Sequence, residues 1–540
     1  MSVAQGATPP YVGRSIEAVL EELRAEGMAL AWSSRLVTPE LRVVAEPGSE
    51  DALDIAREIL AAHGLMLRED EGVYLVVRVP ASAAPATGGE PQSAVTEPRI
   101  ENITVSASRY EVSRDISPSN FVLDQQTIQV MPDVGEDPLR ITHRLPGAAA
   151  SGASARVHFR GGEQSEVGII LNGQRLFDPF HVRDYQNIFS AIDSRAVRGV
   201  EVYTGGFPVR FGDRMSGVVL MESISPDEPA HTEIGISVFN TSLLHAGGSG
   251  DKRWLFSARR GNLDLVIDSK FGRPSYYDVF SQFEADLTPD MTLSANAFYA
   301  DDLVTVVLET DPAELEQAES RTRNGQAWLQ LQNRWSDALT SDTILSLTSY
   351  TNRRVGELND SEKIVGSVSD IRDVTQVGLQ QDWMLRRDDS HLLQWGFSFV
   401  NGRATYDYAG QADYFGLQAI YENQGASVTR SVSAAPDGAS YSVYFADRRK
   451  LSQRTTLEWG LRWDDQTYTG LSSDSQLSPR LSILRRLGER SELRLSWGRY
   501  HQSQGIQELQ VEDGIDNFWP AQRADHLIAG FRHRFRNDVA

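Results

Sequence analysis

The stretch "TLEWGLRWD", residues 456–464, decides the fold class of the larger part of this chain. Apolar and polar residues alternate in it, as they do in a strand with one apolar face and one polar face. The apolar set is Leu457, Trp459, Leu461 and Trp463, and the set between them is Glu458, Gly460 and Arg462. Such a strand belongs to a sheet whose two sides meet different surroundings.

Four further segments repeat the alternation: "AWLQLQNRW" (327–335), "LLQWGFSFV" (392–400), "YSVYFAD" (441–447) and "LRLSWGRY" (493–500). A soluble β-sandwich would bury such apolar faces against each other. Three features favour a transmembrane β-barrel instead. They are strand-like runs of roughly 9–12 residues, aromatic residues near the strand ends, and connections that alternate between long and short. Long polar connections are predicted at 308–324 and 407–438, and tight turns at "LTPDM" (287–291) and "RLGERS" (486–491).

The composition restricts the classes of function. The chain has 540 residues, enough for several domains, and a formal net charge of −22. That charge argues against nucleic acid as a partner, because phosphate binding needs clustered Lys and Arg. Cysteine is absent, which excludes disulfides and thiolate chemistry. No apolar run is long enough for a transmembrane helix, and "MSVAQGATPP" (1–10) is not a signal peptide, so we expect any leader to be missing from this sequence.

The sequence contains no catalytic or metal-binding motif. There is no strand–Gly-x-Ser-x-Gly–helix unit and no H-E-x-x-H motif. His143, His158 and His181 are not spaced as metal ligands and are interpreted as structural or surface residues. We therefore expect no enzyme activity, no cofactor and no metal ion.

Residues 1–79 are predicted to form a small α/β domain. "RSIEAVLEELRAEG" (14–27) places four apolar residues on one helical face: Ile16, Val19, Leu20 and Leu23. "SEDALDIAREILAAHG" (49–64) repeats the scheme, with Ser49 as the expected N-cap and Gly64 after the helix end. Short strands are expected in 29–33, 41–45, 65–68 and 73–79.

The next segments differ in character. Residues 80–100 are rich in Pro, Ala, Gly and Ser and are predicted to form a flexible linker. "ENITVSAS" (101–108) is a short strand-prone octet. Residues 109–228 are predicted to form a compact α+β domain with many glycine turns, and Asn172-Gly173 is its best hairpin signal.

The order of these segments resembles a TonB-dependent outer-membrane receptor of Gram-negative bacteria. The motifs that carry the resemblance lie in "RVHFRGGEQSEVGIILNGQRLFDPFH" (156–181) and "FSAIDSRAVRGVEVYTGGFPVRFGDRMSGVV" (189–219), which resemble the plug domain of that family. The matching positions are Arg160, Gly161, Gly162, Asn172, Gly173, Gly205, Gly206, Phe211 and Gly212. The octet 101–108 resembles a TonB box, and residues 1–79 resemble the secretin/TonB short N-terminal domain, which in some receptors has a signalling role.

The resemblance implies a function and partners. In the family, the TonB periplasmic domain captures the TonB box, here Ile103, Thr104, Val105, Ser106 and Ala107. A free strand edge is suited to such capture, because it adds to a partner sheet through main-chain hydrogen bonds. The alternative is that the octet is the first strand of the plug.

The implied activity is energy-coupled uptake of a scarce small-molecule ligand, most often a siderophore-type iron complex, across an outer membrane. The candidate ligand-binding residues are Arg175, Asp178, His181, Arg183 and Tyr185, against the alternative that they are displayed for solubility. The N-terminal domain would lie in the periplasm and could also signal to an inner-membrane anti-sigma regulator. The rival function is that of a secretin-like structural component of the outer membrane, which the plug-like region argues against.

The expected fold is therefore multi-domain: a small α/β domain, an α+β plug, and an antiparallel transmembrane β-barrel over 229–540. The family barrel has about 22 strands, but alternation identifies only about 13 or 14 strand-like segments in this sequence. We expect a partial barrel, lacking roughly eight strands, that forms an open, C-shaped wall around the plug.

Overall fold

The computed structural model divides into two compact units, Met1–Arg99 and Ile100–Ala540, and each is considered by itself. The residues that the structure describes are 11–25, 28, 30–31, 37, 41–49, 51–70, 73–78, 116–130, 135–183, 186–226, 230–266, 273–309, 316–360, 362–416, 426–469, 476–533 and 535. The predicted linker and the predicted TonB box lie outside these residues.

The first unit is a small α/β domain, as predicted. Its elements are α1 (Ile16–Ala25), β1 (Leu30–Ala31), α2 (Ala52–Ala61), β2 (Leu65–Asp70) and β3 (Val73–Arg78). The strand order is β1-β3-β2, with β1 parallel and β2 antiparallel to β3. The four apolar residues of the predicted α1 face are all buried in the core of this unit, together with residues from α2 and the sheet.

Two local predictions in this unit were wrong. The N-cap of α2 is Asp51 and not Ser49, because the Asp51 carboxylate accepts hydrogen bonds from the amides of Leu53 and Asp54. The segment 41–45 forms no strand: a single bridge joins Arg42 to Ser15.

The plug is a mixed five-stranded sheet with short helices, which is the α+β domain that was predicted. Its longer elements are β4 (Asn120–Asp124), α3 (Gln125–Val130), β5 (Ala148–Ala150), β6 (Val157–Phe159), β7 (Val167–Leu171), β8 (Gln174–Arg175), β9 (Phe180–His181), β10 (Phe189–Ser190), β11 (Val197–Tyr203) and β12 (Gly217–Ser223). The sheet order is β4-β11-β12-β7-β8, with β12 and β7 parallel.

The rest of the second unit is a 15-stranded antiparallel sheet, which we call the wall. Its strands are β13 (His231–Ile236), β14 (Asn240–Ser249), β15 (Lys252–Gly261), β16 (Arg273–Thr288), β17 (Met291–Glu309), β18 (Glu316–Arg334), β19 (Leu339–Asp360), β20 (Ile364–Asp388), β21 (His391–Tyr414), β22 (Ser427–Ala434), β23 (Asp437–Ser452), β24 (Thr455–Gln466), β25 (Gln476–Arg486), β26 (Ser491–Gln502) and β27 (Gln522–His533). A short helix, α4 (Leu263–Val266), follows β15.

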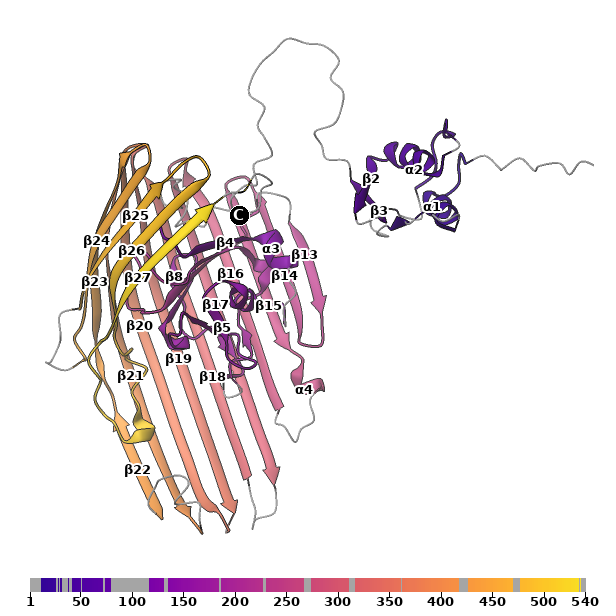
Figure 1. Cartoon of the computed structure of the whole chain (residues 1–540). Coiled ribbons are helices and arrows are strands. Elements are labelled where there is room, and N and C mark those ends of the chain that lie inside the picture. Colours follow the sequence, from indigo (N-terminus) through magenta and orange to yellow (C-terminus); the bar gives the residue numbers. More distant parts are fainter. Residues whose placement is uncertain are drawn as a thin grey trace, which may run out of the picture. The chain divides into compact units, whose positions relative to one another are not determined.

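The wall is curved, and the plug packs against its concave face (Figure 1). One hydrophobic cluster contains Val200 and Val219 of the plug sheet together with Phe298, Trp328 and Ile344 of the wall. The plug core and the inner surface of the wall are therefore continuous.

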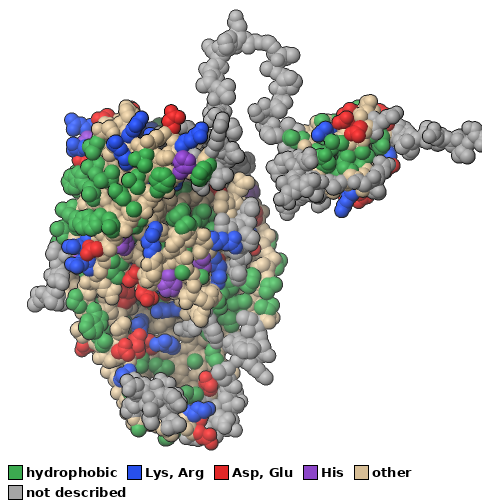
Figure 2. Space-filling model, viewed as in Figure 1, with side chains coloured by type: hydrophobic (Ala, Val, Ile, Leu, Met, Phe, Trp, Pro, Cys, Tyr) green, Lys and Arg blue, Asp and Glu red, His purple; other side chains and the backbone are tan. Residues whose placement is uncertain are grey.

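The alternation of "TLEWGLRWD" appears in the wall with its apolar face outward. Trp459 is 44% exposed on β24, whereas its neighbours Glu458 and Arg462 are buried against the interior. This orientation is the reverse of a soluble sandwich and is the one that a lipid bilayer requires of a barrel with a polar lumen. Figure 2 shows hydrophobic side chains gathered over β23–β27 in the upper left of the view.

Several strands are longer than predicted. β19, β20 and β21 have 22, 25 and 24 residues. The predicted long connection at 308–324 is largely strand, since β18 begins at Glu316, and much of 407–438 belongs to β21 and β22. Polar residues on both faces hid these extensions, whose backbone groups pair with the neighbouring strands.

The wall is open, as predicted. Its strand order begins at β13 and ends at β27, with no pairing between these two strands among the described residues, and the 15 strands are close to the expected 13 or 14. Tight turns such as Asp388 to His391 join strands at one end, which we call the short-turn end. Longer connections such as Gln502 to Gln522 lie at the other, the long-connection end. No helix in the described part of the chain is long and apolar enough to cross a membrane.

Candidate ligand-binding cavity

The Asn172-Gly173 turn joins β7 to β8 as predicted. Both residues have positive φ, 47° and 81°, as a tight two-residue hairpin requires. The Asn172 side chain donates hydrogen bonds to Ser223 Oγ and to Asn296 Oδ1 of the wall, both at 2.9 Å. A Cβ on Gly173 would lie 2.7 Å from Ile344 of the wall, so glycine also permits close packing here. The turn thus fixes β8 against the wall.

Arg160 connects three parts of the plug. Its φ of 51° places it in the left-handed region just after β6. Its guanidinium donates to the Thr204 carbonyl at 2.6 Å and to Ser119 Oγ at 2.7 Å. The same side chain packs 3.5 Å from where a Cβ would stand on Gly205. Arg160 and the 205–206 pair, which are far apart in sequence, therefore form one structural cluster.

Three wall arginines hold the plug backbone. Arg480 donates to the carbonyls of Phe207 at 2.9 Å and Phe211 at 2.8 Å. Arg462 donates to the Arg210 carbonyl at 3.0 Å. Arg494 similarly donates to the Ser117 carbonyl at 3.1 Å. Because Arg462 and Arg480 come from the adjacent strands β24 and β25, they fasten the plug residues 207–211 to one side of the wall, and Arg494 of β26 holds Ser117 on the same side.

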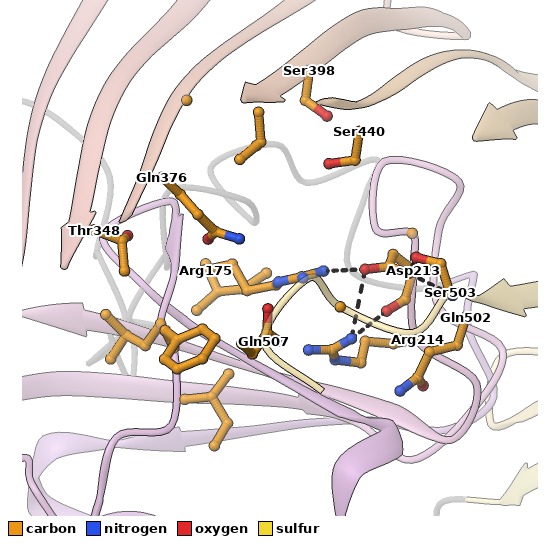
Figure 3. A pocket seen from close by; sticks show the side chains of 18 of the residues that line it. Arg175, Asp213, Arg214, Thr348, Gln376, Ser398, Ser440, Gln502, Ser503 and Gln507 are labelled. Atoms are coloured by element: carbon orange, nitrogen blue, oxygen red, sulfur yellow. Dashed lines mark hydrogen bonds and ion pairs between the residues drawn. The ribbon is translucent and has the colours of Figure 1, made fainter. Parts of the chain in front are cut away.

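A cavity of about 940 Å³ lies between the plug and the wall. Its plug side is formed by β7, β8 and the segment 210–214, and its wall side by β19–β21, β23 and β24. Residues 502–522, which connect β26 to β27, supply a third side. In Figure 3, Thr348, Gln376, Ser398 and Ser440 of the wall lie across the space from Arg175. The lining is thus mostly amides, hydroxyls and charged groups, which suits a hydrogen-bonding ligand.

One ion cluster stands at the plug side of this cavity. Arg175 Nη1 lies 2.9 Å from Asp213 Oδ2, and Arg214 Nη1 lies 3.7 Å from the same oxygen. Ser503, on the 502–522 connection, donates from N and Oγ to Asp213 Oδ1 at 2.8 and 2.7 Å. Burial raises the pKa of the Asp213 carboxyl, but Arg175 and Arg214 outweigh it and hold that pKa below its ordinary value.

The five predicted ligand-binding residues do not all meet at the cavity. Arg175, Asp178 and Arg183 line it. Arg156 and Arg183 pair with Asp178, and Arg183 also contacts the Tyr350 hydroxyl of the wall. Tyr185 lies outside the described residues, and His181 lies elsewhere.

His181 is fully buried between the plug and the wall. Its Nε2 lies 2.9 Å from Asp278 Oδ2 and its Nδ1 lies 2.9 Å from Asp302 Oδ2, on β16 and β17. Both ring nitrogens face carboxylates, which requires the doubly protonated imidazolium. Burial lowers the pKa of His181, but the carboxylates of Asp302 and Asp278 raise it by more than burial lowers it. The pKa of His181 is therefore about 9, above its ordinary value. Arg259 completes the cluster through a 3.0 Å ion pair with Asp278.

Two parts of the cavity were not predicted from the sequence. Asp213 and Arg214 directly follow the Phe211-Gly212 motif, and a charged pair after a glycine turn was a signal that could have identified them. The 502–522 connection has no motif, and it lines the cavity because it folds back into the lumen. There its buried residues Ile506, Leu509 and Val511 pack against wall tyrosines.

Among the described residues, no group of three or more His, Cys, Asp or Glu side chains is arranged to hold a metal ion.

Comparison with known proteins agrees with this architecture. The model of the TonB-dependent receptor-like β-barrel matches residues 254–534, and that of the TonB-dependent receptor plug domain matches residues 113–219. The search of curated proteins gave no match.

Solved structures show the same fold. The siderophore receptor PirA from Pseudomonas aeruginosa is 17% identical with a TM-score of 0.55, over 78% of this chain and 72% of that one. The alcaligin outer-membrane receptor FauA from Bordetella pertussis is 14% identical with a TM-score of 0.52, over 79% and 69%. The RagAB peptide importer is 10% identical with a TM-score of 0.55, over 78% and 66%.

At these identities the structural likeness shows the fold alone. The barrel model, however, spans more than half of the sequence and lies after the plug model along the chain. The chain therefore belongs to the TonB-dependent receptors, a family of outer-membrane β-barrel transporters with a plug domain.

Proposed function

We propose that this protein imports a scarce small-molecule ligand across the outer membrane in a TonB-coupled reaction. The observation that carries the proposal is the polar cavity between the plug and the wall. The cavity lies between the plug, which we expect TonB to rearrange, and the wall, whose strands are held together by backbone hydrogen bonds. A ligand bound there would be released by movement of the plug.

A siderophore-type iron complex is the ligand we propose. PirA is a siderophore receptor and FauA an alcaligin receptor, which supports this choice, whereas RagAB is a peptide importer. Arg175, Asp178 and Arg183 would contact the ligand from the plug side, together with Asp213 and Arg214. His181 is excluded from this role, because both ring nitrogens are bound to wall carboxylates.

Coupling to TonB would use the octet 101–108. Its residues Ile103, Thr104, Val105, Ser106 and Ala107 would add as a strand to a sheet edge of the TonB periplasmic domain. Proline at Ile103 removes a main-chain donor and prevents regular strand addition.

The test uses the full-length receptor in cells that lack other iron-uptake receptors. Import of a panel of radioactive iron–siderophore complexes is measured for wild type, for Ile103→Pro and for the matched linker variant Val95→Pro. We expect Ile103→Pro to abolish import while leaving surface binding intact, and Val95→Pro to behave as wild type. Equal import by all three receptors would overturn TonB coupling through the octet, and import of none of the complexes by wild type would overturn the choice of ligand.

A signalling role of the N-terminal domain is a second proposal. The observation that favours it is that residues within Met1–Arg99 form a separate unit with its own buried core. In the periplasm, this unit would contact an inner-membrane anti-sigma regulator. Deletion of residues 1–79 should preserve import and abolish ligand-dependent induction of the receptor gene. Loss of both would contradict an independent signalling role.

A further inference from the structure

Arg175 and Ser503, from two separate segments, donate hydrogen bonds to the carboxylate of Asp213, and Arg214 Nη1 lies 3.7 Å from it while donating to the Asp213 main-chain carbonyl. Arg175 comes from β8, Arg214 is the next residue along the chain, and Ser503 comes from the 502–522 connection. Asp213 itself has a φ of 53°, in the left-handed region that disfavours an L residue. One guanidinium group, a backbone amide and a hydroxyl donate to this carboxylate and a second guanidinium stands beside it, which is a set of groups that binds an oxyanion.

The site has more positive charge than its carboxylate neutralises. Among the described residues, Arg175 and Arg214 each have one ion-pair partner, and for both of them that partner is Asp213. Burial and the neighbouring Arg175 lower the pKa of Arg214 to about 10. Arg214 Nε is buried and has no hydrogen-bond partner among the described residues. A further acid that acts on Arg214, Glu508, accepts a hydrogen bond from the Gly505 amide at 2.7 Å.

Two other arginines of the cavity, Arg462 and Arg210, are arranged differently. Arg462 has its own partner, Asp464, at 2.8 Å, and its side chain is 8% exposed. Arg210 is likewise paired one to one with Asp382, at 3.4 Å. Arg175 shares its partner, and its side chain is 43% exposed. A ligand in the cavity can therefore reach Arg175, whose charge is only partly neutralised because a second arginine shares its carboxylate.

We propose that Arg175, Arg214 and Ser503 form an oxyanion subsite whose resident occupant is the chain's own Asp213, and that an anionic oxygen group of the imported ligand replaces Asp213 on Arg175. The ligand class is thus one that carries a carboxylate, phosphate or other ionised oxygen group. The inference rests on the proposed function, because it specifies how the ligand enters the same cavity.

The exchange also has a mechanical consequence. When Arg175 turns to the ligand, Asp213 keeps its two hydrogen bonds to Ser503. The Asp213 carboxylate then keeps its contacts with Ser503 of the 502–522 connection and with Arg214, and loses its ion pair with Arg175 of β8. Occupation of the subsite thereby loosens the plug sheet from the segment that follows Gly212.

The first experiment is chemical rescue with the missing functional group. The melting temperature of the full chain in detergent is measured for wild type and for Asp213→Ala. Each protein is measured with added acetate and with added acetamide, the neutral counterpart of acetate, at matched ionic strength. We expect Asp213→Ala to melt at lower temperature and acetate, but not acetamide, to restore at least half of the loss. Asp290→Ala, which breaks an exposed pair with Arg334 at the short-turn end, is the control and should not respond to acetate. The absence of acetate-specific rescue in Asp213→Ala overturns the subsite.

The second experiment measures competition. Ferric citrate, an anionic iron complex, is titrated while quenching of tryptophan fluorescence is followed, since Trp519 lines the cavity and is 54% exposed. If Asp213 competes with the ligand, the isosteric Asp213→Asn should tighten binding about fivefold and Arg175→Gln should weaken it about tenfold. A purely structural Asp213 predicts weaker binding in both variants, and that result, or equal binding in all proteins, overturns the proposal.

Failure here is distinguishable from failure of the transport proposal. The variant Ile103→Pro tests coupling to TonB and does not involve the cavity. A receptor that imports iron complexes only with an intact octet, but whose Asp213→Asn form binds ferric citrate more weakly, keeps the proposed function and loses the oxyanion subsite.

Discussion

Arg462 of the wall lies directly over Gly212 of the plug, so close that a Cβ on Gly212 would stand 1.8 Å from the Arg462 Nε. The guanidinium cannot move away easily, because it is paired with Asp464 and donates to the Val209 and Arg210 carbonyls. The glycine of the Phe211-Gly212 motif is therefore required by the contact between two domains and not by its own backbone.

We accordingly expect Gly212→Ala to destabilise the plug against the wall by roughly 1–3 kcal/mol, the usual cost of overpacking. Calorimetric melting of the detergent-solubilised protein measures the change. Gly488→Ala is the matched control, since a Cβ there meets nothing within 4 Å. Equal melting temperatures for Gly212→Ala and wild type would show that the Arg462 side chain can move aside at little cost in stability.

The hydrogen bonds of Arg480 predict a second effect. Arg480→Met retains most of the side-chain length but leaves the Phe211 carbonyl without its donor and the Phe207 carbonyl with only the Tyr500 hydroxyl at 3.4 Å, at a cost of about 1–3 kcal/mol for a group left unsatisfied. Hydrogen exchange of the plug segment 204–214 should become faster. Arg485→Met on the same strand, where the side chain bonds Thr455 at the short-turn end, should leave that segment unchanged. Uniform acceleration over the whole plug would instead indicate global unfolding.

The His181 cluster predicts how the attachment of the plug depends on pH. The folded pKa of His181 is about 9, above the ordinary value of 6.5, so the imidazolium stabilises the folded state fully below pH 6.5. That stabilisation, on the order of a few kcal/mol, is lost as the pH rises from 6.5 through 9. Deprotonation leaves Asp278 and Asp302 with Arg259 as the remaining cation.

Melting temperatures measured between pH 6 and pH 10 test this dependence. Wild type should lose stability over the upper part of that range, and His181→Gln should be less stable at pH 6 but vary less with pH. His231→Gln serves as control, because His231 is half-exposed at the edge strand β13. Parallel curves for wild type and His181→Gln would contradict a buried imidazolium.

Local patterns predicted the parts of the fold that depend on local sequence. The Asn172-Gly173 hairpin follows from two residues that accept positive φ, and the α1 core face follows from helical spacing. The wall strands around Trp459 follow from alternation, because one face meets the plug and the other the bilayer. In each case the local sequence, over a few neighbouring residues, determines whether a side chain is buried or exposed.

Other features depend on contacts between distant segments and gave no such signal. The polar ends of β18 and β21 have hydrophilic residues on both faces, so alternation could not reveal them. Arg175 was identified as a candidate, but its partner Asp213 and the donor Ser503 come from separate segments. His181 was a candidate for ligand binding because its loop resembles the plug loops that can meet substrate in the family, and only the wall carboxylates on β16 and β17 show that both of its ring nitrogens are engaged.

The connection between β26 and β27 gives the last prediction. It crosses the lumen and is fastened to the far wall at Tyr406, whose hydroxyl donates to the Ile506 carbonyl at 2.7 Å and accepts from the Leu509 amide at 3.2 Å. Arg372 adds a 2.7 Å ion pair to Glu512 beside it. Two backbone groups of one connection therefore depend on a single phenol.

Tyr406→Phe removes both of these bonds and keeps the ring in place. We expect a loss of about 1–3 kcal/mol of local stability and faster hydrogen exchange confined to residues 503–515. Because Ser503 holds Asp213 of the plug, a loosened connection should also weaken binding of ligand in the cavity. Tyr299→Phe, whose hydroxyl bonds only Asp301 and Tyr277 on the wall in the described part of the chain, tests whether any lost tyrosine hydroxyl has the same effect. Unchanged exchange in 503–515 would mean that packing of Ile506 and Leu509 is sufficient to hold the connection across the lumen.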